Sequence, residues 1–405
     1  MLLPLTPPTS ALSRVVDQLR AIGTLSRVEI AERTGLAPAT ITHAVRDLLT
    51  AGLVREVGVE QRPLGQPRRL LRLETDAWRA VGIQIDAAAA RAVVTDFAGR
   101  VVASAALPGT GSRHPQRVVE DLADDVRLLL RSAGAPLDRV LGAGLVTHGP
   151  QDRLAGTLRI DRPTPAWRGF PLTDALSAAL GLPVLLENDA TAAAMGELRV
   201  GTPPAPDFAL VYLGAGVGGA VIVDGAPYRG RSSNSVEIGH VSLTGGDAPC
   251  PCGKRGCVEA EAGPLAVVAA VTGSPELAAE LGVSAEPSRA LEDFERIARA
   301  ARDGDERVAP ILEASARRIG DAALVLADLF DVDAVVLAGP ALATAGPVYR
   351  RAVARALEGS IVRDPERRPR AALSADATAS AAVGAALHVL RSAPVPPPSR
   401  EEGAG

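Results

Sequence analysis

One histidine and three cysteines form the densest group of potential metal ligands in this 405-residue chain. Cys250, Cys252 and Cys257 are its only cysteines, and with His240 they give the pattern H-x9-C-x-C-x4-C. Four such ligands are typical of a closed, tetrahedral structural site, so we predict one structural Zn²⁺ per chain. All four positions are filled by protein, which leaves none for a catalytic water. The alternatives are three unrelated buried thiols, or a redox pair formed by Cys250 and Cys252.

Two carboxylates flank this motif. Glu237 lies three residues before His240, and Glu259 lies two residues after Cys257. When one imidazole nitrogen binds a metal, the other carries the proton and becomes an oriented hydrogen-bond donor. We therefore interpret Glu237, His240 and Glu259 as candidate contacts for the hydroxyl groups of a ligand. The alternative is that the two glutamates are ordinary solvated charges.

A second polar pair, Asn188 and Asp189, stands where the apolar run 182–186 gives way to a helical pattern. In α/β proteins, ligands bind at the carboxyl ends of strands, so this pair is a candidate part of a binding cleft. The alternative is that Asn188 or Asp189 simply caps the following helix.

The N-terminal segment has a different pattern. Helices are expected over about 12–21 and 27–33, and a third begins near Pro38. Apolar residues recur in the third helix at the spacing of one buried face; they are Ile41, Val45 and Leu48. Two short arginine-bearing strands, 53–57 and 68–73, follow. A short helix, a glycine turn, a second helix and a hairpin together predict a winged helix-turn-helix that binds DNA.

The expected DNA contacts lie at the start or on the outer face of the third helix and in the wing. They are Ala39, Thr40, Thr42, His43, Arg46, Arg62, Arg68 and Arg69. Residues 11–75 carry ten Arg and seven Asp or Glu, so their net charge is +3, in a chain whose total is −4. A basic head on an acidic body suits contact with nucleic acid. The alternatives are a chance fluctuation of charge and a small helical subdomain that binds no nucleic acid.

From about residue 80, strands alternate with glycine turns and helices. Residues 80–107 and 208–230 share one strand–turn–strand rhythm, which predicts an internal duplication and two α/β lobes around a cleft. The expected units are disordered tails at 1–10 and 392–405, the winged helix at 11–75, a first lobe at 76–195 completed by a C-terminal helix at about 376–391, and a second lobe with the zinc motif at 196–375. With neither a long apolar span nor a signal-peptide pattern, the chain is expected in the cytoplasm.

The stretch LVYLGAGVGGAVIVDGAPYRGRSSNSVEIGH, followed by CPCGKRGCVE, resembles the ROK family of repressors, open reading frames and sugar kinases. The resemblance covers about residues 80–390 and implies a two-lobed actin-like, RNase H-like ATPase-type body. Together with the winged helix it implies a repressor that binds operator DNA as a homodimer or homotetramer. In the family, the positions of Asn188, Glu237, His240 and Glu259 contact a sugar, and that of Asp189 is the general base of the kinases.

The sequence departs from the kinases of that family at the first phosphate loop. The kinase pattern D-x-G-G-T is replaced by Asp86-Ala87-Ala88-Ala89-Ala90, in which added Cβ atoms obstruct phosphate and the threonine hydroxyl is missing. The second loop, 214–219, keeps most of its glycines but has Ala215 where kinases have threonine. His148 replaces the first proline of a family T-P-G-P segment, and it either lines the cleft or lies in a surface loop.

We therefore expect no catalysis. The predicted function is a transcriptional regulator, most simply a repressor, of carbohydrate metabolism genes that responds to a sugar or sugar-phosphate effector. The first alternative is an ATP-dependent sugar kinase with an appended DNA-binding head. The second is a regulator whose body only dimerises or binds a protein partner.

Overall fold

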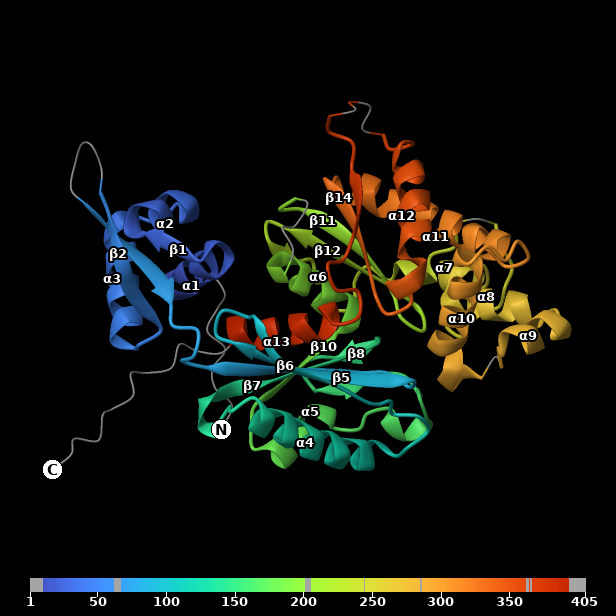
Figure 1. Cartoon of the computed structure of the whole chain (residues 1–405), viewed down its shortest axis with the longest axis horizontal. Coiled ribbons are helices and arrows are strands. Elements are labelled where there is room, and N and C mark those ends of the chain that lie inside the picture. Colours follow the sequence, from blue (N-terminus) through green and yellow to red (C-terminus); the bar gives the residue numbers. More distant parts are fainter. Residues whose placement is uncertain are drawn as a thin grey trace.

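The chain folds into an N-terminal winged helix and a body of two α/β lobes (Figure 1). The computed structural model describes residues 10–61, 67–200, 205–243, 245–284, 286–361, 364 and 366–392. Arg62 and nearly all of both predicted tails lie outside these ranges. At the described margins, Ser10 caps the first helix and Ser392 ends the last.

The winged helix contains α1 (Ala11–Ile22), α2 (Arg27–Thr34) and α3 (Pro38–Thr50). Ser26 and Glu29 form a capping box at the start of α2, and Gly35 ends that helix in the left-handed conformation. Ile41, Val45 and Leu48 are fully buried, as their spacing predicts. The hairpin consists of β2 (Val54–Glu60) and β3 (Arg68–Leu73), and a strand that the sequence did not reveal, β1 (Thr24–Ser26), completes the sheet.

The first lobe is built on a five-stranded sheet of order β10-β7-β4-β5-β6. Its strands are β4 (Arg79–Ile85), β5 (Ala89–Asp96), β6 (Val101–Pro108), β7 (Val140–Thr147) and β10 (Val184–Asn188). The first three form an antiparallel meander, and β7 and β10 run parallel to β4. Helices α4 (Pro115–Ser132) and α5 (Leu172–Leu180) share an apolar core with this sheet.

The second lobe repeats this topology. Its sheet has the order β13-β12-β11-β14-β15, with an antiparallel meander followed by two parallel strands. The strands are β11 (Phe208–Leu213), β12 (Val217–Val223), β13 (Ala226–Pro227), β14 (Ala334–Ala338) and β15 (Arg370–Leu373). Helices α11 (Ala309–Phe330) and α12 (Leu342–Leu357) pack together and share its core. The matching strand orders show the duplication that the sequence rhythm predicts.

Two helices lie between the sheets, α6 (Asp189–Val200) and α13 (Ser380–Ser392) (Figure 1). α13 packs on β4 and β7 of the first lobe, whereas α6 packs on α13 and on β11 and β12 of the second. The boundary expected after residue 195 therefore falls inside α6, where the chain passes from one lobe to the other.

Several short elements complete the fold. They are β8 (Gln151–Asp152), β9 (Thr157–Leu158), α7 (Val258–Ala262), α8 (Pro264–Thr272), α9 (Pro275–Leu281) and α10 (Ala290–Arg302). Among the described residues, no helix combines the length and apolarity needed to cross a membrane.

Candidate metal centre, cleft and nucleic-acid interface

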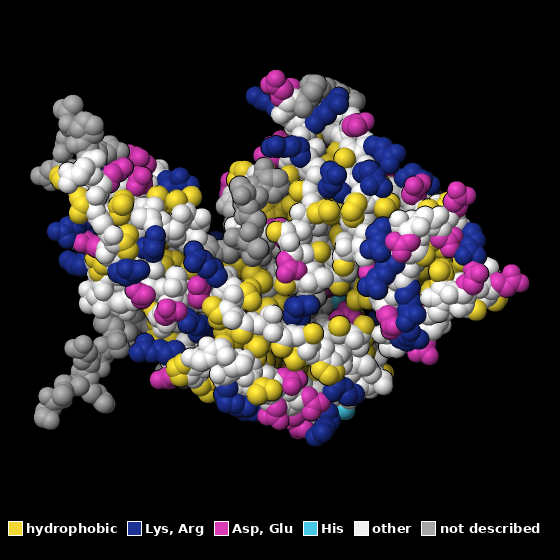
Figure 2. Space-filling model, viewed as in Figure 1, with side chains coloured by type: hydrophobic (Ala, Val, Ile, Leu, Met, Phe, Trp, Pro, Cys, Tyr) yellow, Lys and Arg dark blue, Asp and Glu magenta, His cyan; other side chains and the backbone are white. Residues whose placement is uncertain are grey.

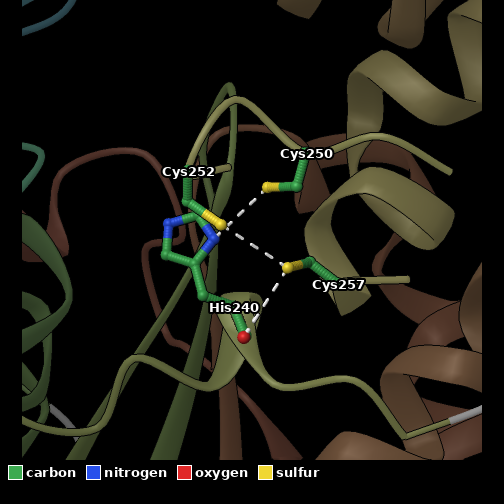
Figure 3. A group of neighbouring side chains, drawn as sticks. All are labelled: His240, Cys250, Cys252 and Cys257. Carbon is green, nitrogen blue, oxygen red and sulfur yellow. Dashed lines mark hydrogen bonds between the residues drawn. The ribbon is translucent and has the colours of Figure 1, made fainter. Parts of the chain in front are cut away.

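The predicted metal ligands converge in the second lobe (Figure 3). One ligand atom from each of His240, Cys250, Cys252 and Cys257 lies within 4.8 Å of all the others. Cys252 Sγ is 3.7 Å from Cys257 Sγ, and Cys250 Sγ is 3.6 Å from His240 Nδ1. Metal–ligand bonds of about 2.3 Å to sulfur and 2.0 Å to nitrogen give tetrahedron edges of about 3.8 Å between two sulfurs and about 3.5 Å between sulfur and nitrogen. The four residues therefore fit a tetrahedral metal ion.

The loop that carries the cysteines is held by its own backbone and by one glutamate. Cys250 donates its N–H to the carbonyl of Lys254 over 2.9 Å, and Gly256 donates to Ala248 over 2.9 Å. Gly256 has φ +69°, and a Cβ there would lie 2.2 Å from a backbone oxygen, so only glycine fits. Glu261 accepts the N–H of Ala248 over 2.8 Å. These bonds bring the cysteines, which lie up to seven positions apart, to one point.

His240 is oriented by this cluster. Its Nδ1 faces Cys250, so Nε2 is the nitrogen left to donate outward when a metal is bound. Without a metal ion, burial raises the pKa of the Cys257 thiol to about 12, whereas the backbone N–H of Lys254 lowers the pKa of Cys252. Metal binding must therefore displace protons from the cluster.

Residues of both lobes meet around Gly149. The position of a Cβ on Gly149 would lie 3.4 Å from Asn188 Nδ2 and 3.6 Å from Glu237 Oε1. Asp189 follows Asn188, and a Cβ on Gly218 of the second lobe would lie 3.9 Å from Asp189 Oδ1. The structure thus brings Asn188, Asp189 and Glu237 to one place between the lobes. Asn188 also accepts the N–H of Thr191 over 3.1 Å, so the capping alternative is true of it as well.

The carboxylates of this cleft perturb one another. Burial raises the pKa of Asp189; the charge of His148 opposes this rise, and that of Asp86 reinforces it. Although Glu237 is an exposed residue, the protein packed around its carboxyl raises its pKa. The charge of His240 opposes this rise in the pKa of Glu237, and the charges of Asp189 and Glu259 reinforce it. His148 is half-buried and lies close enough to Asp189 for its charge to act on that carboxylate.

Glu259 was predicted to contact a ligand, and in the structure its carboxylate binds the backbone of loop 214–219. Its Oε2 accepts the N–H of Val217 over 2.9 Å, and a Cβ on Gly216 would lie 2.2 Å from the same oxygen. A Cβ on Gly219 would lie 2.7 Å from the carbonyl of Val236. Gly216 and Gly219 thus pack closely against Glu259 and Val236, whether or not a nucleotide binds there.

The first phosphate loop is closed on itself. Ala88 donates its N–H to Asp86 Oδ1 over 3.1 Å, and the backbone of Asp86 accepts from Thr110 over 2.9 Å. A Cβ on Gly109 would lie 2.3 Å from the Ala88 backbone, so the two segments are in close contact. The Ala88 amide, which a phosphate would need, is already bonded within the loop.

The predicted DNA-binding side chains of α3 all lie at the surface. Ala39, Thr40, Thr42, His43 and Arg46 are exposed. The Thr42 hydroxyl donates to the carbonyl of Pro38 over 2.9 Å, which orients its methyl group and its oxygen lone pairs outward. Basic and acidic side chains are interspersed over this domain (Figure 2).

In the wing, Arg69 is exposed and pairs with Glu56 at 2.5 Å, and Arg68 is half-buried. The pairing raises the pKa of Arg69 and holds its charge near β2. A DNA phosphate would therefore have to compete with Glu56 for Arg69, whereas Arg46 has only a 3.7 Å pair with its neighbour Asp47.

Sequence reasoning missed the residue beside Asn188. Glu187 is 1% exposed, and its carboxylate contacts Arg153 at 3.3 Å and Arg229 at 2.5 Å. The only local signal was an acidic residue at the end of an apolar strand, and its partners lie far away in the sequence.

Comparison with known proteins agrees with this architecture. The sequence profile of the ROK family matches residues 80–392, and that of a winged helix-turn-helix DNA-binding domain matches residues 13–55. NagC of Escherichia coli, named a DNA-binding transcriptional dual regulator, is 26% identical over 82% of this chain and 80% of its own length. The xylose repressor of Caldicellulosiruptor bescii is 26% identical over 58% of this chain and 59% of its own length.

Solved structures show the same fold. A ROK family transcriptional regulator, described as a homologue of E. coli MLC, superposes with a TM-score of 0.73 over 95% of this chain and 96% of its own, at 22% identity. A ROK hexokinase from Thermus thermophilus gives a TM-score of 0.59 over 76% of this chain and 97% of its own, at 28% identity. The kinase accounts for the body, whereas the regulator also accounts for the winged helix.

Proposed function

The chain belongs to the ROK family, and from that membership we propose that it is a transcriptional repressor released from operator DNA by a sugar. The winged helix binds the operator, and the cleft between the lobes binds the effector. The relatives named above support the regulatory role. The xylose repressor among them points to genes of carbohydrate use.

One observation carries this proposal: the groups for binding a sugar are present, whereas the loop for binding phosphate is altered. Asn188 and Glu237 both lie beside Gly149, and the carboxylate of Asp189 lies beside Gly218. Such carboxylate and amide groups suit the hydroxyls of a sugar. In the phosphate loop that begins at Asp86, by contrast, the Ala88 amide donates a hydrogen bond to Asp86 within the loop. A protein that keeps the sugar-binding groups but lacks a working phosphate loop can sense a sugar without phosphorylating it.

A panel of sugars tests the proposed effector class. D-Xylose, N-acetyl-D-glucosamine, D-glucose and their phosphates are added to the full chain at millimolar concentration, and the melting temperature is measured. At least one is expected to raise it, because a ligand that binds only the folded state stabilises it by mass action. No shift with any of them would favour a body that only dimerises or binds a protein.

ATP-dependent sugar phosphorylation is expected to be absent. In a coupled assay with each sugar of the panel, turnover should stay at the level of the Asp189→Asn variant, because the first loop uses its Ala88 amide internally and lacks the threonine hydroxyl for phosphate. The ROK hexokinase named above serves as the positive control. Turnover by wild type that Asp189→Asn abolishes would establish the kinase alternative.

We propose Zn²⁺ as the metal of the cluster, one per chain. Three thiolates and one imidazole match the donor set that zinc prefers, and the distances match its tetrahedron. With four protein ligands the ion is structural. It holds the loop that carries Glu259 and fixes the ring of His240, so that both can face the effector.

Operator recognition is assigned to α3 and the wing. The proposed contacts are Ala39, Thr40, Thr42, His43, Arg46, Arg62, Arg68 and Arg69, of which Arg62 lies outside the described residues. Two such domains in a homodimer, or in a homotetramer built of dimers, would read half-sites about one helical turn apart.

Arg46→Ala should weaken operator binding about 5- to 150-fold, the effect of losing an arginine contact worth about 1–3 kcal/mol. The measurement is a fluorescence-anisotropy titration with a duplex selected from random sequence by the full chain. Arg117→Ala, an exposed arginine on α4, is the matched control and should leave affinity unchanged. Equal affinity of Arg46→Ala and wild type would show that α3 is not the recognition helix.

A further inference from the structure

A buried carboxylate lies directly behind the effector cleft. Glu187 Oε1 accepts the backbone N–H of Asn188 over 3.0 Å, so the position of the cleft residue depends on it. Its two oxygens also contact Arg153, at 3.3 Å, and Arg229, at 2.5 Å. A buried charge held by two partners is costly to disturb, because removing one partner leaves an uncompensated charge.

The partners of Glu187 come from both lobes. Arg153 follows β8 in the first lobe, and Arg229 follows β13 in the second. Next to Arg229, Asn234 accepts the N–H of Gln151 over 2.8 Å and donates to its carbonyl over 2.9 Å. Segment 229–234 therefore binds segment 151–153 and Glu187 across the cleft. A change in the angle between the lobes must strain or break these hydrogen bonds and ion pairs.

The same cluster contacts α13. Arg153 Nη2 lies 3.2 Å from His388 Nε2. Burial lowers the pKa of His388 to about 4, so its imidazole is neutral and Nε2 accepts from the guanidinium. The helix also has close backbone contact with β4 and α6, because a Cβ on Gly82 would lie 1.8 Å from the Ala382 carbonyl and one on Gly384 would lie 1.7 Å from the Ala192 carbonyl. Contacts this close couple the position of α13 to the positions of β4 and α6.

One turn further along, α13 contacts the DNA-binding head. Arg391 Nη2 lies 3.4 Å from Asp17 Oδ2 of α1. On the same face of α1, Arg20 is buried and donates to the carbonyl of Phe97 in the first lobe over 3.2 Å. One apolar cluster joins the core of the winged helix, through Phe97, to Leu387 and Leu390 of α13. Asp17 and this cluster tie the head to α13, and Arg20 ties it to the first lobe.

A hollow of about 460 Å³ lies at the junction of the head with the first lobe, between Gly52 of the head and residues 134–139 of the body. In the space-filling view a gap is seen between the winged helix and the upper part of the second lobe (Figure 2). The contacts with α13 and the first lobe described above hold the head in place.

We propose that Glu187, Arg153, Arg229 and His388 form a relay that transmits lobe movement to α13, and that the Arg391–Asp17 contact passes it to the winged helix. This proposal rests on the proposed function and adds the path between its two sites. In the structure the relay is intact, and it holds the arrangement that we assign to the DNA-binding state. Glu187 is thus a positioning residue for Asn188 and the first link to the head.

A double-mutant cycle tests the path without knowledge of the effector. The affinity of the full chain for the selected duplex is measured for wild type, Glu187→Gln, Arg391→Gln and the double variant. Glu187→Gln is expected to weaken binding at least fivefold in the wild-type background and less than twofold when Arg391 is already replaced. Arg168→Gln, an exposed arginine whose pair with Asp161 spans 3.5 Å, is the matched background and should preserve the fivefold effect.

The outcomes separate the relay from the function. Equal fold-changes in the Arg391→Gln and wild-type backgrounds, or no effect of Glu187→Gln at all, would overturn the relay but leave the repressor intact. Selection of no duplex by the full chain would overturn both. Should Glu187→Gln fail to fold by circular dichroism, His388→Leu replaces it in the same cycle, because it removes the contact with Arg153 without uncovering a buried charge.

Discussion

Replacing Cys252 by serine is expected to release the metal ion and destabilise the second lobe. Cys252 is an exposed ligand, so the substitution removes a metal bond with little loss of packing. Structural zinc contributes about 10–16 kcal/mol to the folding of isolated zinc-finger peptides. Even a third of that would lower the melting temperature of a lobe of this size by roughly 10 °C or more.

Elemental analysis and thermal unfolding measure this effect. Wild type should carry one zinc per chain, and Cys252→Ser should carry almost none and gain little stability from added zinc. Asp247→Asn, on the same loop and paired with Arg255, is the control and should keep its metal. Zinc-free wild-type protein, prepared without chelator, would contradict a structural zinc site.

Glu237→Gln should weaken binding of the effector sugar about 10- to 150-fold while leaving the fold unchanged. A hydrogen bond to a charged group contributes about 1.5–3 kcal/mol, and Gln offers one neutral acceptor in place of the carboxylate. Asn188→Ala should weaken it too, but it also removes the helix cap at Thr191, so Glu237→Gln gives the clearer result.

Isothermal titration with whichever sugar of the panel shifts the melting temperature provides the measurement. Glu276→Gln, an exposed glutamate at the start of α9, is the control and should bind as wild type does. Unchanged affinity of Glu237→Gln would place the sugar outside the cleft around Gly149.

The features that could be predicted from the sequence are those written in short stretches. The metal ligands span 18 positions, and their glycines force a local fold, so the spacing alone indicated the cluster that the structure shows. The same holds for the winged helix, where Ser26, Gly35 and Pro38 mark the limits of α2 and α3 by their capping chemistry. In both cases neighbours in the sequence are neighbours in space.

The relay could not be predicted for the opposite reason. Arg153 and His388 are 235 positions apart, and an arginine or a histidine on its own carries no signal of its partner. The glycines of loop 214–219 show a second limit. The sequence suggested an eroded nucleotide loop, whereas the structure gives Gly216 a packing role against Glu259. A residue type required for one reason in a family can be required for another reason in one member.

Reciprocal linkage between the sugar site and the operator site is the decisive measurement for a sugar-controlled repressor. The affinity of the full chain for its selected duplex is measured with and without saturating sugar, and the affinity for the sugar with and without duplex. Sugar is expected to weaken DNA binding, and DNA to weaken sugar binding by the same factor. Sugar that binds in the cleft, as judged by its loss in Glu237→Gln, but leaves the duplex affinity unchanged would contradict this expectation.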